Sequence, residues 1–159
     1  MKKYGPAGVK NFGDPNSHLY QAGRQVGIEF TSKRKIYPTV MAHALVEHVK
    51  QTDNDKANKL MEEMYEEYFC QGSNINDLSV LTTIAARCGL DEQETAKACQ
   101  DADLQLQVRK KDREYKTQSG VSGVPFYIIQ PIKGGRPFGF SGAQPAEIIA
   151  EQLEMAAEE

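Results

Sequence analysis

Three cysteines, Cys70, Cys88 and Cys99, are the side chains of this 159-residue sequence that could carry redox chemistry. An odd number of widely spaced cysteines argues against the disulfide framework of a small secreted protein. Cys88 and Cys99 are the candidate redox pair, because Cys99 follows the capping-box helix that comes after Cys88 and could approach it. A disulfide between them needs Cα atoms within about 7 Å. Cys88 also lies on an apolar helix face, which is typical of a buried, inert thiol. Cys70 is predicted at a helix C-terminus, where the dipole disfavours a catalytic thiolate.

The histidines do not indicate a metal site. His18, His43 and His48 are scattered, and together with the cysteines they lack the ligand spacing of a zinc site. We therefore expect no bound metal. His43 has apolar neighbours at helical spacing, which is more typical of a core or capping histidine than of a catalytic one.

A glycine-rich stretch leads through Gly123, Val124 and Pro125 into the apolar segment 126–129. The bond before a proline is the one peptide bond whose cis form costs as little as about 0.5–1 kcal/mol. A proline at the start of a strand also removes no hydrogen bond that the strand needs. The sequence therefore predicts a fixed, sharply turned loop at these three residues, as a candidate active-site loop.

Six helices are predicted before this loop from apolar residues at helical spacing and from end signals. Glycines at 27, 72 and 89 end the first, third and fourth of them, and Asp91 with Glu94 forms the capping box of the fifth. The helices are predicted to begin at Asp14, Pro38, Asp53 or Asn54, Asn76, Asp91 and about Asp103. On the third helix, a core or packing surface is expected from Met61, Met64, Tyr65, Tyr68 and Phe69.

After residue 118 the apolar spacing changes from that of a helix to that of a strand. Segments 126–130 and 136–140 are predicted to pair as a hairpin, and a last helix begins at Pro145. Segment 126–129 is apolar on both faces, which is typical of a strand covered on both sides. Because an isolated hairpin is marginally stable, further pairing is expected, for example in a domain-swapped homodimer that covers its open edge.

The composition is typical of one soluble domain. Apolar residues make up 40% and the net charge is -3, and no apolar stretch approaches the about 18 residues of a membrane span. The basic clusters 33–35 and 109–111 have acidic neighbours, so no nucleic-acid partner is expected. The N-terminus has no secretory signal. With the cysteine pattern, this favours a cytoplasmic location.

Four short motifs occur in the order and at the spacing of one known family. They are Y-P-T-V-M-A-H-A-L at 37–45, Y-F-C-Q-G-S-N-I-N-D at 68–77, S-G-V-P-F at 122–126 and S-G-A-Q-P at 141–145. Together they resemble the DsbA-like thioredoxin domain, in its FrnE-like branch, over nearly the whole chain. Thr39 and His43 fall on the family's threonine and histidine, whereas Pro38 replaces a usual Asn and Ala44 a common Arg.

The resemblance implies a mostly helical α/β chain with a partial thioredoxin-like fold. Residues 1–118 would be the helical insertion subdomain, and residues 119–159 the C-terminal hairpin and helix of the thioredoxin core, together one domain. The family's core opens with a strand, a C-x-x-C helix and a second strand. No C-x-x-C occurs in this sequence. The resemblance therefore implies a truncated or inactive form that lacks this unit.

The activity implied is thiol–disulfide exchange, in which a C-x-x-C thiolate attacks a disulfide through a mixed disulfide. With the catalytic cysteines absent, the remaining site would be Gly123, Val124 and Pro125. Their backbone would pair with an extended or disulfide-containing polypeptide. Thr39 and His43 are the site-adjacent residues that the resemblance implies.

Two alternatives to an oxidoreductase stay open. One is a non-catalytic module that binds peptides or proteins through the same loop. The other is a relative of the kappa-class glutathione transferases and isomerases, which would use glutathione; otherwise no cofactor is expected.

Overall fold

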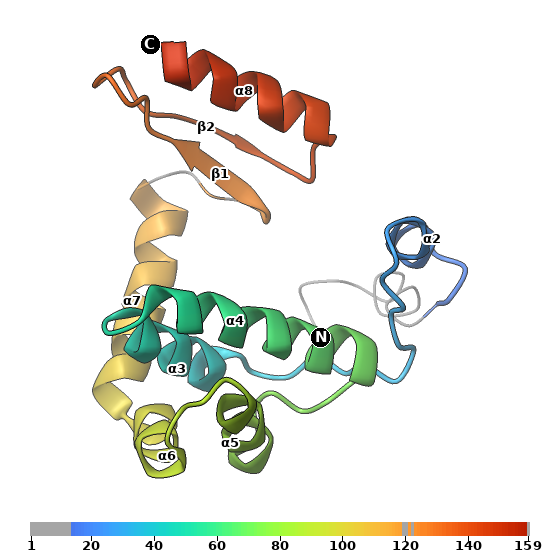
Figure 1. Ribbon diagram of the computed structural model, residues 1–159, viewed down its shortest axis with the longest axis vertical. Helices are drawn as coiled ribbons and strands as arrows, with labels where there is room; N and C mark the ends of the chain where they lie inside the picture. Colours follow the sequence, from blue (N-terminus) through green and yellow to red (C-terminus); the bar gives the residue numbers. More distant parts are fainter. Residues whose placement is uncertain (1–13, 119–120, 122, 159) are drawn as a thin grey trace. The chain divides into compact units, whose positions relative to one another are not determined.

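The computed structural model describes residues 14–118, 121 and 123–158. In this part of the chain there are seven α-helices, one π-helix and two β-strands, so the protein is mostly helical with a small sheet, as predicted (Figure 1). In chain order the elements are α2 (His18–Gln25), α3 (Val40–Lys50), α4 (Asn54–Tyr65), η1 (Glu66–Gln71), α5 (Leu78–Arg87), α6 (Glu92–Gln100), α7 (Ala102–Gln118), β1 (Phe126–Ile129), β2 (Phe138–Ser141) and α8 (Ala146–Glu158).

The chain divides into two compact units, with the boundary between Arg109 and Lys110. This boundary lies inside α7, so the first half of this helix belongs to the helical unit and the second half to the hairpin unit. The division of the family's subdomains at 118/119, after the sixth helix, stays a prediction. Each unit is described by itself below.

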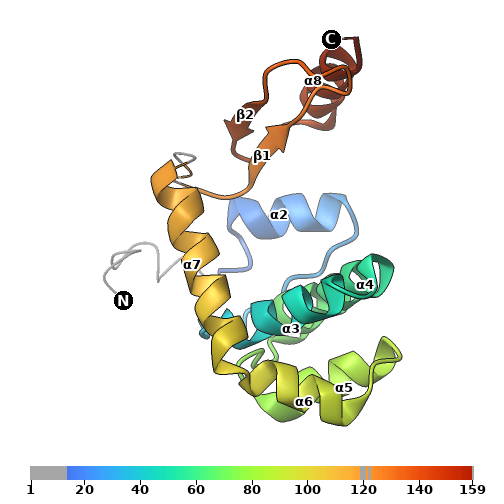
Figure 2. The same cartoon turned by 90° about the vertical axis from the view of Figure 1, so that its left-hand side faces the viewer.

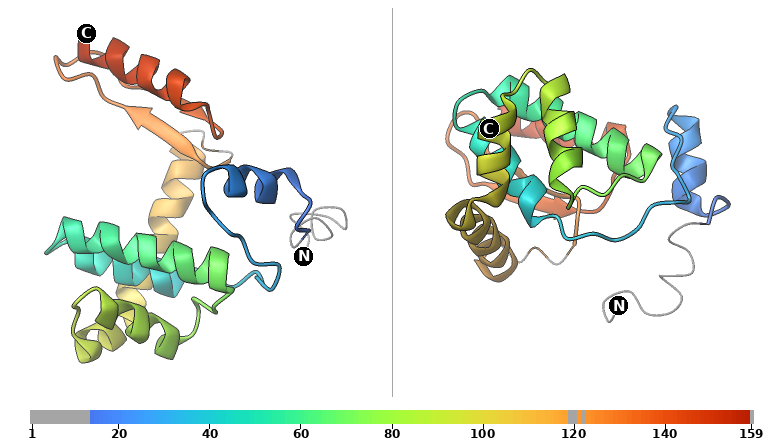
Figure 3. Two further views of the ribbon diagram at one scale, coloured as in Figure 1. Left: turned by 45° about the vertical axis from the view of Figure 1, so that its right-hand side comes forward. Right: turned by 90° about the horizontal axis from the view of Figure 1, so that it is seen from below.

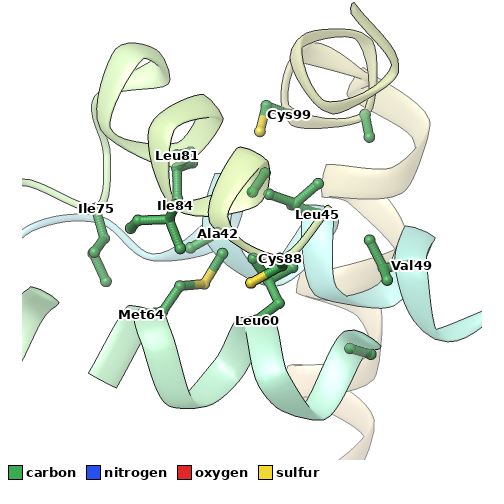
Figure 4. Packing of buried hydrophobic residues seen from close by; sticks show 13 residues of the cluster. Ala42, Leu45, Val49, Leu60, Met64, Ile75, Leu81, Ile84, Cys88 and Cys99 are labelled. Carbon is green, nitrogen blue, oxygen red and sulfur yellow. The ribbon is translucent and has the colours of Figure 1, made fainter. Parts of the chain in front are cut away.

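The helical unit is built around one apolar core. Helix α3 packs against α4 and α6, and α5 packs against the same two helices (Figures 2 and 3). Leu45, Leu60 and Leu81 are completely buried, and each contributes about 1.5–3 kcal/mol through the removal of apolar surface from water. The core, shown in Figure 4, consists of Ala42, Leu45, Val49, Ala57, Leu60, Met64, Ile75, Leu81, Ile84, Ala85, Cys88, Ala98 and Cys99.

Three helices of this unit have an aspartate as N-cap, namely Asp53 for α4, Asp77 for α5 and Asp91 for α6. The carboxylate of Asp91 accepts a hydrogen bond from the amide of Glu94 at 2.9 Å, so the predicted cap of α6 is confirmed. Helix α5 is capped one residue later than predicted, by Asp77 rather than Asn76. The Asp77 carboxylate accepts from the Ser79 amide at 2.9 Å, which satisfies one of the amides that a helix start leaves without a partner.

The first two helices begin later than the sequence predicts. The Asp14 carboxylate accepts from the amide of Asn16 at 2.9 Å, and the Asp14 carbonyl accepts from the amide of Ser17 at 3.0 Å. These bonds form a turn, so the N-cap of α2 is Ser17 rather than Asp14. Helix α3 follows Thr39 rather than Pro38, because Thr39 has φ -112°, outside the helical range.

A π-helix, η1, continues α4 where the sequence predicted one regular α-helix. A π-turn contains more residues than an α-turn and is frequent at functional sites. It ends at Gly72, the predicted stop, which has φ +77°. A Cβ at this position would also lie 3.2 Å from Cγ2 of Thr31, so both the backbone and the space favour glycine.

The hairpin unit contains the predicted pair of strands. β1 and β2 are antiparallel, with Phe126 opposite Ser141 and Ile129 opposite Phe138. The second strand begins two residues later and ends one residue later than predicted. Helix α8 lies alongside this hairpin (Figures 1 and 3). Ile128 is 54% exposed. Within the described residues, β1 is therefore only partly covered, although its sequence predicted cover on both faces.

No helix in the described part of the chain combines the length and the apolar content needed to cross a membrane.

Candidate functional site

The loop predicted as a candidate site lies at the surface of the hairpin unit. Gly123, Val124 and Pro125 are exposed, and 87% of Val124 is accessible. The Val124–Pro125 bond is cis, and the carbonyl of Pro125 accepts a hydrogen bond from the amide of Gly142 at 2.9 Å. This bond joins the loop to the predicted S-G-A-Q-P corner. Residues 119, 120 and 122, in the glycine-rich stretch that leads into this loop, lie outside the described residues.

This loop leads directly into a strand with an unused edge. Among the described residues, β1 pairs with β2 alone, so the opposite edge of β1 presents backbone N–H and C=O groups without a strand partner. Such an edge can accept an extended polypeptide as an additional strand. Val124 in the loop and Ile128 in β1 have exposed side chains. These side chains could contact those of the bound polypeptide.

The other two predicted residues, Thr39 and His43, lie together in the helical unit. Their spacing of four residues places them on one face at the start of α3, and both line a pocket of about 150 Å³. Apolar and aromatic side chains form most of its wall. The lining residues are Thr39, Ala42, His43, Met61, Met64, Tyr65, Tyr68, Phe69 and Ile75.

The methionines and aromatic residues of this pocket wall were predicted from the sequence to form a core or packing surface. Met64 is indeed part of the core, but Tyr65 is 54% exposed. The spacing of Met61, Tyr65 and Phe69, four residues apart, puts them on one face of α4 and η1. That periodicity was visible in the sequence, but it does not distinguish the lining of an open pocket from a covered core.

Two arginines hold the π-helix that carries part of this wall. The guanidinium of Arg34 lies 4.8 Å from the ring centre of Phe69 and 5.5 Å from that of Tyr68, within the range of cation–π attraction. On another side of η1, Arg87 pairs with Glu67 at 2.8 Å and with Glu63 at 3.0 Å. These contacts tie η1 both to the segment before α3 and to α5.

The carboxylate of Glu67 is kept ionised by this network. The Ser73 hydroxyl donates a short hydrogen bond to it, and the Arg87 guanidinium adds two favourable effects, a hydrogen bond and an opposite charge. The Ser73 hydrogen bond and the two effects of Arg87 lower the pKa of Glu67, whereas partial burial raises it. The network is thus charged at neutral pH and links the end of η1 to α5.

The candidate redox cysteines are free thiols in the core. Cys88 and Cys99 are both buried, and in the view of Figure 4 Leu45 lies between them. Burial raises the pKa of Cys99 to about 11 and also raises that of Cys88. The half-buried thiol of Cys70 has a raised pKa too, through burial and the nearby carboxylate of Glu66. Because the thiolate is the nucleophile, all three are poorly suited to exchange chemistry.

Among the residues that the structure describes, no group of three or more His, Cys, Asp and Glu side chains could hold a metal ion. The loop belongs to the hairpin unit and the pocket to the helical unit, so each is a separate candidate for binding.

Comparisons with known proteins point to one family. The sequence matches the DSBA-like thioredoxin domain over residues 7–154. The chain is 28% identical to a protein from Streptomyces coelicolor assigned as a DsbA oxidoreductase, with a TM-score of 0.75 over 96% of this chain and 60% of that one. It thus spans less than two thirds of that relative.

A second solved structure has the same fold. It is a protein from Nitrosomonas europaea assigned as a protein disulfide isomerase, 18% identical, with a TM-score of 0.76 over 89% of this chain and 71% of that one. No curated protein matches the chain.

Proposed function

This chain belongs to the DSBA-like thioredoxin domain family, and on that premise we propose that it forms the substrate-docking part of a thiol–disulfide oxidoreductase of the FrnE-like branch. The observation that carries the proposal is the exposed loop Gly123–Pro125, which leads into a strand with an open edge. An extended segment of a disulfide-containing polypeptide would pair with this edge through its backbone.

The reaction of such an enzyme needs a dithiol. A thiolate attacks one sulfur of the substrate disulfide, the other substrate sulfur leaves as a thiolate, and a second cysteine then resolves the mixed disulfide. The 159 residues contain no C-x-x-C, and burial raises the pKa of the cysteines that they do contain. In our proposal the dithiol is therefore supplied from outside these residues, and the chain alone is catalytically inactive.

The loop would position the substrate for this reaction. The backbone of Val124 would hold the polypeptide in an extended conformation, and the exposed Val124 side chain would contact its apolar residues. A non-catalytic peptide-binding module would use the same loop, so the two functions differ in exchange activity and not in docking. No described residue favours the glutathione-dependent alternative, and the swapped homodimer stays a prediction.

Insulin reduction by dithiothreitol tests the proposed activity. We expect the 159-residue chain to leave the rate of insulin precipitation at the dithiothreitol background. A longer natural form of the protein that carries a C-x-x-C should accelerate it, and the Val124→Asp change in that form should reduce the acceleration.

Two results would overturn this proposal. Acceleration by the 159 residues alone, lost when all three cysteines are replaced by alanine, would mean that these cysteines carry out the exchange. Absence of acceleration by a C-x-x-C form would favour the non-catalytic binding module.

A further inference from the structure

We propose that the pocket lined by Thr39, His43 and Met61 binds a single aromatic ring of phenol type. This inference concerns the helical unit and does not rest on the proposed oxidoreductase function. Its basis is the size of the pocket, the chemistry of its wall and the two polar groups at its edge.

The size of the pocket fits one ring. Its volume is about 150 Å³, and an apolar cavity of about 150 Å³ engineered in another protein holds one benzene molecule. In a two-ring ligand the second ring would extend through the open mouth of the pocket or displace its floor. That floor is formed by Ala42, Met64 and Ile75, which are buried and belong to the apolar core (Figure 4), so it cannot retreat without the loss of core packing.

The wall favours an aromatic occupant over an aliphatic one. Met61 and Met64 contribute thioether sulfurs, which make favourable contacts with the edges of aromatic rings. Tyr65 and Phe69 add ring faces and edges, and aromatic pairs gain free energy in tilted and edge-to-face arrangements beyond the area that they bury. Tyr65 and Phe69 already pair with each other at 5.9 Å, so a third ring could extend this cluster.

The edge of the pocket explains the preference for a hydroxyl substituent. The Thr39 side chain makes no cap hydrogen bond, and both Thr39 and His43 are exposed lining residues of the pocket, so their polar groups are accessible to a ligand. A hydroxyl and an imidazole can each donate to or accept from a phenol oxygen. Thr39 is the N-cap of α3 and His43 lies on its first turn, so a ring in the pocket could direct its hydroxyl towards them.

The experiment uses the full 159-residue chain with 13C-labelled methionine methyl groups. Titration with p-cresol should shift the signals of Met61 and Met64, and should leave that of Met155 on α8 unchanged. Toluene, which lacks the hydroxyl, should bind about threefold to tenfold more weakly, as expected for one lost hydrogen bond. The isosteric Thr39→Val variant should reduce this preference for p-cresol, because only His43 then remains to bind the hydroxyl, and should keep the binding of toluene.

Two further titrations identify the source of the ring. An acetylated and amidated Ala-Tyr-Ala peptide that shifts the same two signals as strongly as p-cresol would assign the pocket to tyrosine side chains of polypeptides. A peptide that binds much more weakly would assign it to free phenols. The proposal is overturned if none of these ligands shifts Met61 and Met64 at millimolar concentration, or if Met155 shifts equally, which would indicate non-specific binding.

Discussion

The Leu60→Ala variant should lose about 3 kcal/mol of the free energy of unfolding of the helical unit, within the range of about 2–5 kcal/mol for such substitutions. Leu60 on α4 is completely buried and lies within the single core of that unit. The truncation removes apolar contacts and leaves a cavity that the neighbouring helices fill only partly. Hydrogen exchange of the most protected amides of α3, α4 and α5 measures this loss without the assumption that the two units unfold together.

Leu106→Ala is the matched control. Leu106 on α7 is 64% exposed, so the same truncation should change the free energy of unfolding by no more than about 0.5 kcal/mol. A loss below 1 kcal/mol for Leu60→Ala, or equal losses for the two variants, would show that the helical unit is not held together by this core.

Alkaline pH should destabilise the helical unit through Cys99. The raised pKa of about 11 in the folded protein compares with about 8.5 for an unfolded thiol. The stabilising contribution of the buried, neutral Cys99 thiol is therefore fully present below about pH 8.5 and is lost as the pH rises towards 11, because Cys99 loses its thiol proton at lower pH in the unfolded chain than in the folded protein. The loss should reach about 3 kcal/mol at the upper end of this range.

The Cys99→Ala variant isolates this effect from the titration of tyrosines and lysines, which occurs in both proteins. It should be less stable than the natural sequence at neutral pH, and the difference should shrink between pH 9 and 11. Urea unfolding followed by circular dichroism at several pH values gives the two profiles. Parallel profiles would mean that the Cys99 thiol does not become harder to ionise on folding.

The elements that the sequence predicted well are those fixed by local chemistry. Asp91 caps α6 because its carboxylate reaches an amide three residues later, and Gly72 ends η1 because its φ is positive. The π-helix before Gly72 was not predictable in this way. The π-helix contacts Arg34 and Arg87, which lie in distant parts of the sequence. Helical periodicity reports only on residues that are close together in the sequence.

The candidate sites were predictable to different degrees. A family motif singled out Thr39 and His43, and the structure places both in one pocket. Met61 and Tyr65 were assigned to a packing surface, because an apolar stripe has the same spacing whether another element covers it or not. Cys88 was interpreted as an inert core thiol and also, with Cys99, as a candidate redox pair. The structure contains both as buried free thiols, because α5 and α6 both contribute to the core.

The docking of an extended polypeptide on the loop before β1 is the central claim, and nuclear magnetic resonance of the 15N-labelled 159-residue chain tests it most directly. We expect an S-methylated insulin B chain to shift the backbone amide signals of residues 123, 124 and 126–129. Val124→Asp should weaken binding about tenfold, which corresponds to about 1.4 kcal/mol. Ile132→Asp, at a position that is similarly exposed at 84%, should leave the affinity unchanged. Shifts confined to the helical unit, or equal effects of the two variants, would contradict the claim.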